Sequence, residues 1–323
     1  MQNSTMSPHV EPAALSDGAI HDMLQDQSTC LLGEGGSCSV FLVNYKGASR
    51  CLKVSTLKGN TAFLREASTL LALDGAGGAP RLLGVSDGKG QELALLTTYC
   101  GEHTFDDLPR LAPTDAKMLR AFLDLCRALQ QVHARGVVHN DIKANNVVVR
   151  LDPDNGRLHV SLIDYGLARG KGLTLFHEPY DHSLAPWMAP EELECEPCQP
   201  AGDVYSLACL LDEILYSCTA LYPDLMEVVL QALSPSPEER PSVRAVAKAV
   251  QRCLSPPRRS FGSRLRSFFG GLKNTFGSCL PLRSRGRGNT PVSWTVSRAH
   301  ANASVSATNI SASETASSAV THH

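Results

Sequence analysis

The side chains best suited to chemistry lie in two short polar stretches of this 323-residue chain. Asp141, Lys143 and Asn146 lie in the first stretch, and Asp164 follows a hydrophobic run eighteen residues after Asn146. In phosphoryl transfer, one carboxylate accepts or orients the proton of the attacking hydroxyl, and oxygen ligands hold Mg²⁺ on the nucleotide. Asp141 suits the first role, and Asn146 with Asp164 suits the second. Lys143 can neutralise the charge that builds on the transferred group.

A glycine-rich run near the start of the chain suits contact with phosphate oxygens. Glycine has no Cβ, so backbone N–H groups can approach an anion closely. The run alone is weak evidence, because a plain turn between two strands has the same composition. Its residues are Gly33, Glu34, Gly35, Gly36, Ser37, Cys38, Ser39 and Val40.

Lys53 and Glu66 form a candidate ion pair. Lys53 lies within an otherwise apolar run, where an unpaired charge is costly, and Glu66 is the only acid between Lys53 and Asp74. We expect the two to pair, with the ammonium left free to hold phosphate oxygens. The alternative is a lysine whose end reaches solvent and a solvated glutamate.

These residues and their order resemble the eukaryotic protein kinase superfamily over roughly residues 30–254. The nucleotide-loop pattern of that family falls on Gly33, Gly35, Cys38 and Val40. Cys38 stands where the pattern has its last glycine. Lys53 and Glu66 match the strand lysine and its helix partner, with a short connector between them.

The later motifs of the family follow in order. The catalytic loop matches His139, Asp141 and Asn146, the metal-binding triplet matches Asp164, Tyr165 and Gly166, and the end of the activation segment matches residues 187–191. Asp203 and Arg240 match a buried acid on a central helix and the arginine that pairs with Glu191. Residues 98–100 resemble the hinge whose backbone meets adenine, behind a small residue, Thr97.

The resemblance implies an α+β, two-lobed fold. The N-lobe (residues 29–97) is expected to be a small antiparallel sheet with one helix, and the C-lobe (residues 98–254) to be mostly helical. It implies ATP and Mg²⁺ as cofactors and a protein as substrate. Catalytic roles fall on Asp141, Lys143, Lys53 and Glu66, and metal binding on Asn146 and Asp164. Nucleotide contacts fall on Leu32, Gly33, Glu34, Gly35, Gly36, Ser37, Cys38, Val40, Lys53, Thr98, Cys100, Asn146 and Asp164.

Three departures from the family pattern bear on function. Asn140 replaces the arginine that normally contacts a phosphorylated activation loop, so activation by loop phosphorylation is not expected. The stretch from Asp203 to Arg240 is short, which puts protein-substrate docking in doubt. Lys143 favours serine/threonine specificity, whereas residues 183–186 lack the usual threonine, so tyrosine or dual specificity stays open.

A nucleotide-binding pseudokinase or scaffold is the other alternative, although its usual mark, loss of a catalytic residue, is absent from the sequence.

The elements that must position these residues follow from periodicity and turn signals. Short strands are expected at 39–43, 51–54, 81–85 and 93–99 around a helix at 61–73. A helix at 114–133 and short strands at 137–138, 147–149 and 158–163 follow. Residues 170–190 have no period and are expected to form a long loop. Three further helices are expected at 204–215, 224–233 and 242–254.

Composition and charge limit the remaining possibilities. The chain has 43% hydrophobic and 19% charged residues, as a globular protein does, and no run of 18 uncharged apolar residues. Eleven scattered cysteines without a secretory signal suit free thiols in a reducing compartment, so a cytoplasmic location is expected, with attachment at a membrane surface as an option. The isolated Cys195–Cys198 pair is weak evidence for a metal.

The net charge of −2 conceals an acidic part and a basic part of the chain. Residues 1–240 contain 18 Lys/Arg and 31 Asp/Glu, whereas residues 241–323 contain 12 and one. Residues 1–28 are expected to be a mobile leader and 289–323 a disordered tail. The basic segment 255–288 has phenylalanines and leucines at helical spacing. Three hypotheses stay open for this segment: it is disordered, it binds an anionic membrane or a regulatory protein, or it folds back on the acidic lobes. Nucleic acid binding is not expected.

Overall fold

The computed structural model describes residues 11–35, 38–55, 57, 61–87, 93–176 and 178–255. Gly36 and Ser37 lie outside the described residues. Of the predicted segments 255–288 and 289–323, only residue 255 is described. Among the helices that are described, none has the length and apolar character needed to cross a bilayer.

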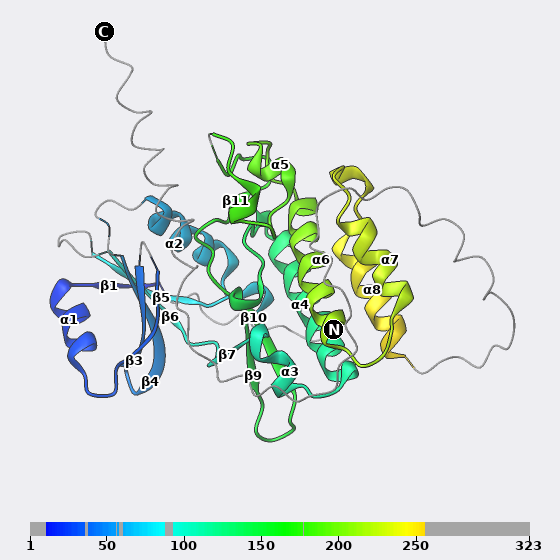
Figure 1. Ribbon diagram of the computed structural model, residues 1–323. Coiled ribbons are helices and arrows are strands. Elements are labelled where there is room, and N and C mark those ends of the chain that lie inside the picture. The colour runs from blue at the N-terminus through cyan, green and yellow to red at the C-terminus, as the bar shows by residue number, and fades with distance from the viewer. Residues whose placement is uncertain are drawn as a thin grey trace, which may run out of the picture. The chain divides into compact units, whose positions relative to one another are not determined.

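A six-stranded sheet forms the first part of the fold, in the order β1-β5-β6-β4-β3-β2 (Figure 1). Neighbouring strands are antiparallel, except that β1 and β5 are parallel. β3 and β4 meet in a two-residue turn where Lys46 and Gly47 both have positive φ, as a type I′ hairpin requires. The strands are β1 (Ala13–Leu15), β2 (Cys30–Glu34), β3 (Cys38–Tyr45), β4 (Ala48–Ser55), β5 (Leu82–Ser86) and β6 (Ala94–Thr98).

One helix, α2 (Thr61–Leu73), packs against β5 and has the predicted bounds. Phe63, Ala67 and Leu70 recur at helical spacing and are buried in one cluster with Leu82 and other residues of the sheet. Glu66 lies on the same buried face of the helix. The periodicity that predicted the helix is therefore the pattern that carries Glu66 inward.

The prediction of a mobile leader over residues 1–28 is wrong for its described part. β1 pairs with β5, and α1 (Asp17–Gln25) is capped by Ser16, whose side chain accepts a hydrogen bond from the backbone N–H of Ala19. Ile20 is fully buried and packs with Val43 and Leu52 of the sheet. The helix escaped prediction because it is short, and only the sheet supplies the partner for its apolar face.

The second part of the fold is mostly helical. Helices α4, α6, α7 and α8 lie side by side (Figure 1), and α4 contacts both α6 and α8. Leu125 and Leu129 of α4, Leu211 of α6 and Val250 of α8 are buried in one core. The helices are α3 (Leu108–Leu111), α4 (Asp115–Ala134), α5 (Pro190–Leu193), α6 (Pro200–Ser217), α7 (Pro223–Ala232) and α8 (Val243–Leu254).

Short strands and single turns complete the helical part. β7 (His103–Thr104), β9 (Val147–Leu151) and β10 (Leu158–Leu162) form one antiparallel sheet, and β8 (Val137–Val138) pairs with β11 (Arg169–Gly170). The predicted loop 170–190 contains the 3₁₀ turn His182–Leu184 and is anchored where Thr174 bridges to Pro197. The other 3₁₀ turns span Ala76–Gly78, Phe105–Asp107, Ala144–Asn146 and Pro237–Glu239. Besides β1 and α1, the sequence prediction missed β2, β7, β11, α3 and α5.

Candidate active site

The polar loop between β8 and β9 is fastened to helix α6 by Asp203. This carboxylate is fully buried and accepts hydrogen bonds from the backbone N–H groups of His139 and Asn140, each at 2.8 Å. The His133 ring nitrogen Nε2 lies 2.7 Å from its Oδ2. Burial alone would raise the pKa of Asp203, but these hydrogen bonds and the nearby histidines lower it overall. Asp203 is therefore a charged anchor for the loop, and His133 is a partner that sequence reasoning missed.

His139 is held as a neutral ring. Its Nε2 lies 3.1 Å from the carbonyl oxygen of Ile163, which can only accept, and its Nδ1 accepts from the backbone N–H of Asp141 at 3.2 Å. Burial lowers the pKa of His139, in agreement with a single proton on Nε2. Tyr165 packs edge-on against this ring, with centroids 4.7 Å apart. The ring thus joins the polar loop to the segment that carries Asp164.

Asp141 stands at the centre of a cluster of donors. Its Oδ2 accepts from Asn146 Nδ2 at 2.8 Å and lies 3.0 Å from Lys143 Nζ. Its Oδ1 accepts from the indole Nε1 of Trp187 at 2.8 Å. Asp141 is only 5% exposed, so these contacts replace most of its hydration. The structure brings Asp141, Lys143 and Asn146 together, and it adds Trp187, to which the sequence pattern assigned no contact.

Lys53, Glu66 and Asp164 form a second ionic cluster. Lys53 Nζ lies 2.7 Å from Glu66 Oε2 and 3.0 Å from Asp164 Oδ1. The expected Lys53–Glu66 pair is therefore present, and it extends to an acid 111 residues further along the chain. Burial opposes the charge on Lys53, but the two carboxylates outweigh it and raise its pKa.

The two acids of this cluster differ in surroundings. The ammonium of Lys53 lowers the pKa of Asp164 to about 2, so this carboxyl is ionised at neutral pH. Burial raises the pKa of Glu66, against the opposing effect of Lys53. Asp164 has 45% of its side chain exposed, whereas Glu66 has 8%. The exposed, ionised carboxylate is the one of the pair that can meet a cation or a ligand from solvent.

Asn140 occupies a strained position that its side chain explains. Its φ is +63°, in the left-handed region that asparagine tolerates better than most residues. Its Nδ2 donates to the carbonyl oxygen of Leu167 at 2.9 Å. Asn140 thereby connects the polar loop to the chain that follows Asp164. This contact gives the residue a structural role in place of the arginine of the family pattern.

The described part of the glycine-rich run lies at the end of β2 and the start of β3. Gly33 pairs with Val40, and the N–H of Gly35 donates to the carbonyl oxygen of Cys38. A Cβ built on Gly33 would meet no atom within 4 Å, so packing does not require glycine there. Leu32 is 44% exposed on β2. The open space beside Gly33 leaves its backbone accessible to a ligand.

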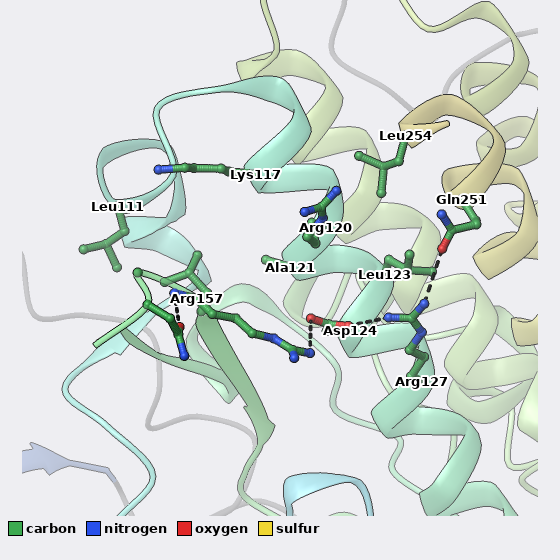
Figure 2. Close-up of a pocket in the computed structure, with 13 residues that line it drawn as sticks. Leu111, Lys117, Arg120, Ala121, Leu123, Asp124, Arg127, Arg157, Gln251 and Leu254 are labelled. Atoms are coloured by element: carbon green, nitrogen blue, oxygen red, sulfur yellow. Dashed lines mark hydrogen bonds and ion pairs between the residues drawn. The ribbon is translucent and has the colours of Figure 1, made fainter. Parts of the chain in front are cut away.

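Two cavities mark other parts of the surface. One of about 390 Å³ is lined in part by Thr98 and Cys100 at the end of β6, so these two predicted residues border a cavity. Another of about 520 Å³ lies along α4, near the end of α8 (Figure 2). In Figure 2, Arg127 and Arg157 both point to Asp124. The described residues lining this larger cavity include none of the predicted site residues.

Comparisons with known proteins agree with this geometry. The model of the protein kinase domain family matches residues 27–235. The chain belongs to the protein kinase family. The predicted two-lobed kinase fold, with a sheet-based N-lobe and a mostly helical C-lobe, is confirmed. The sheet and α1 and α2 form the N-lobe, and α3 to α8 belong to the C-lobe.

Several curated proteins resemble parts of the kinase chain. It is 34% identical over 207 residues to serine/threonine-protein kinase PkaA of Streptomyces coelicolor, covering 59% of this chain and 36% of that one. It is 32% identical over 199 residues to retinal guanylyl cyclase 1 of Bos taurus, with 57% and 17% covered. It is 25% identical over 268 residues to human dual specificity testis-specific protein kinase 2, with 71% and 45% covered. The chain spans less than half the length of these relatives.

Proposed function

We propose that this chain is an ATP-dependent protein kinase that phosphorylates serine and threonine hydroxyls. The observation that carries the proposal is the pairing of two clusters. One is centred on the buried Asp141, and the other joins Lys53 to Glu66 and Asp164. They are connected where the N–H of Ile163 donates to the carbonyl oxygen of Asn146.

In this proposal each cluster has its own task. Lys53, oriented by Glu66, holds phosphate oxygens, and backbone N–H groups of the glycine-rich run contact them. Asp141 accepts the proton of the substrate hydroxyl while that oxygen bonds to the γ-phosphorus and the bond from the γ-phosphorus to the leaving oxygen of ADP breaks. Lys143 stabilises the charge of the transferred group.

The proposed cofactor fits the residues at the site. Asp164 offers an ionised, half-exposed carboxylate, and Asn146 offers an amide oxygen beside it in the fold, since its Nδ2 is used by Asp141. Carboxylate and carbonyl oxygens are the ligands that Mg²⁺ prefers. When bound with ATP, Mg²⁺ would neutralise phosphate charge at this position.

A nucleotide-binding module without phosphotransfer is the second candidate. It stays in the test because one relative is named as a guanylyl cyclase and not as a protein kinase. The presence of Lys53, Asp141 and Asp164 favours catalysis instead, with Lys53 paired to Asp164 and Lys143 paired to Asp141. The preference for serine and threonine over tyrosine rests on Lys143 and on the similarity to serine/threonine kinases, while the dual specificity relative keeps tyrosine in the test.

The test is a phosphotransfer assay on the full chain with radiolabelled ATP, Mg²⁺ and a degenerate peptide library, followed by identification of the labelled acceptor. Asp141→Asn should lower the rate by about 10²–10⁴-fold, because it removes the proton acceptor. Asp154→Asn, the same change on an exposed turn, serves as the matched control and should leave the rate unchanged. Equal labelling by wild type and Asp141→Asn would rule out catalysis by this chain, and labelled tyrosine alone would rule out the specificity.

A further inference from the structure

Trp187 makes a contact that no other residue of the candidate site duplicates. Asn146 and Lys143, which bind Oδ2 of Asp141, come from the same loop as Asp141 itself. Trp187 comes from the segment before α5, 46 residues away, and its indole N–H donates to Oδ1 at 2.8 Å. With a donor on each oxygen, the carboxylate cannot rotate about its Cβ–Cγ bond without breaking a hydrogen bond.

The same indole also contacts the lysine of the cluster. Lys143 Nζ lies 4.5 Å from the centre of the Trp187 ring, within the range of a cation–π interaction. One side chain therefore holds the carboxylate of Asp141 with its edge and the ammonium of Lys143 with its face. Both groups are assigned to the transfer step in the proposed function, and both have less than a fifth of their side chains exposed.

The fold holds Trp187 in place from both sides. The next two residues, Met188 and Ala189, are fully buried, and the N–H of Met188 donates to the carbonyl oxygen of Ala185. Helix α5 begins directly after them at Pro190. The position of the indole is therefore set by the packed core of the helical lobe and not by a free surface loop.

The hydrogen bonds also distinguish the two oxygens of Asp141. A carboxylate oxygen has about two acceptor positions. Oδ2 uses two, for Asn146 and Lys143, whereas Oδ1 uses one, for Trp187. Oδ1 is thus the oxygen with an acceptor position left for a substrate hydroxyl. The indole N–H lies on the oxygen that would receive the proton.

We propose that Trp187 is a positioning residue for phosphoryl transfer, which fixes Asp141 with its indole N–H and Lys143 with its ring face. The inference rests on the proposed function, because it gives the contact its catalytic meaning. The substrate hydroxyl donates its proton to Oδ1 as its oxygen bonds to the γ-phosphorus, and ADP leaves. Trp187 touches neither reacting atom, and it acts through the two residues that do.

The first experiment tests the contact without any need for activity. The chain has two tryptophans, Trp187 and Trp294, so its ¹H–¹⁵N spectrum contains two indole N–H signals, and Trp294→Phe assigns them. A hydrogen bond to a carboxylate moves an N–H proton downfield. The Trp187 signal should therefore move upfield in Asp141→Ala, whereas the Trp294 signal should stay. An unmoved Trp187 signal would overturn the inference.

The second experiment measures the catalytic consequence. Trp187→Phe keeps an aromatic face for Lys143 but loses the N–H. Replacement of Trp187 by benzothienylalanine, which has sulfur in place of the N–H, loses the donor and keeps the shape of the indole ring. Loss of a hydrogen bond to a charged group predicts a fall in kcat of about 10- to 100-fold for both. The KM for ATP should stay within about twofold, because Lys53 and the glycine-rich run are unchanged in both variants.

The outcomes separate the two hypotheses. If wild type is active and the benzothienylalanine protein has the same kcat, the positioning role is wrong while the proposed function stands. If wild type is no more active than Asp141→Asn, the proposed function is wrong, and the catalytic meaning of the contact is overturned with it. A parallel rise in the KM for ATP and fall in kcat would indicate general damage to the fold and would also count against the inference.

Discussion

Replacing Arg240 with alanine should destabilise the kinase fold strongly. Its side chain is fully buried and meets Glu191 through two hydrogen bonds, Nη1 to Oε1 at 2.6 Å and Nη2 to Oε2 at 2.8 Å. The same guanidinium donates to the carbonyl oxygens of Ser234, Pro235 and Ala201. These bonds connect α5, α6 and the segment before residues 237–239 at one point.

The magnitude follows from this burial. Removing one partner of a buried ion pair costs about 3–5 kcal/mol, since the remaining charge is left without compensation. Glu191 keeps 14% of its side chain exposed, so water can solvate part of its charge. We therefore expect a loss of about 3 kcal/mol, or a fall in Tm of roughly 6–12 °C for a domain of this size. Arg240→Lys keeps the charge but not the forked contact, and should lose an intermediate amount.

Urea unfolding of the full chain, followed by far-UV circular dichroism, measures these losses. Arg157→Ala is the matched control, because Arg157 is 63% exposed and lies 3.5 Å from Asp124 Oδ2 (Figure 2). An exposed pair of this kind contributes at most about 1 kcal/mol. Equal losses for Arg240→Ala and Arg157→Ala would refute the argument from burial.

Three further substitutions test other parts of the fold. Burial and nearby carboxylates raise the pKa of Glu192, so the stability that its protonated form gives at low pH is lost as the pH rises. Glu192→Gln should therefore have a higher urea midpoint than wild type at pH 8 but not at pH 4. Urea midpoints of the two proteins that change equally with pH would contradict this. Ile20→Ala should cost about 2–5 kcal/mol in the same urea assay, whereas a mobile leader would tolerate it. Gly77→Ala should lower the Tm, because φ is +67° and the new Cβ would collide with the backbone of Ala128; an unchanged Tm would show that this turn relaxes.

Strong periodicity made much of the fold predictable. The apolar spacing in 61–73 predicted α2 with its observed bounds, and the spacing in 114–133 predicted α4 to within one residue. Helix α1 and strand β1 were missed, because each is too short to show a period and depends on the sheet for its partner. Helix α6 begins at Pro200, ahead of the predicted start, since proline suits the first turn of a helix.

The sequence by itself predicted the family of this protein and the pairing of Lys53 with Glu66. A lone charge in an apolar strand needs a partner, and Glu66 is the only acid between Lys53 and Asp74. The structure added the second partner, Asp164. The tertiary structure alone decided that His133 reaches Asp203 and that the indole of Trp187 reaches Asp141. Such contacts join residues 46 to 70 positions apart, and they depend on how helices and loops pack, which no local pattern of residue types encodes.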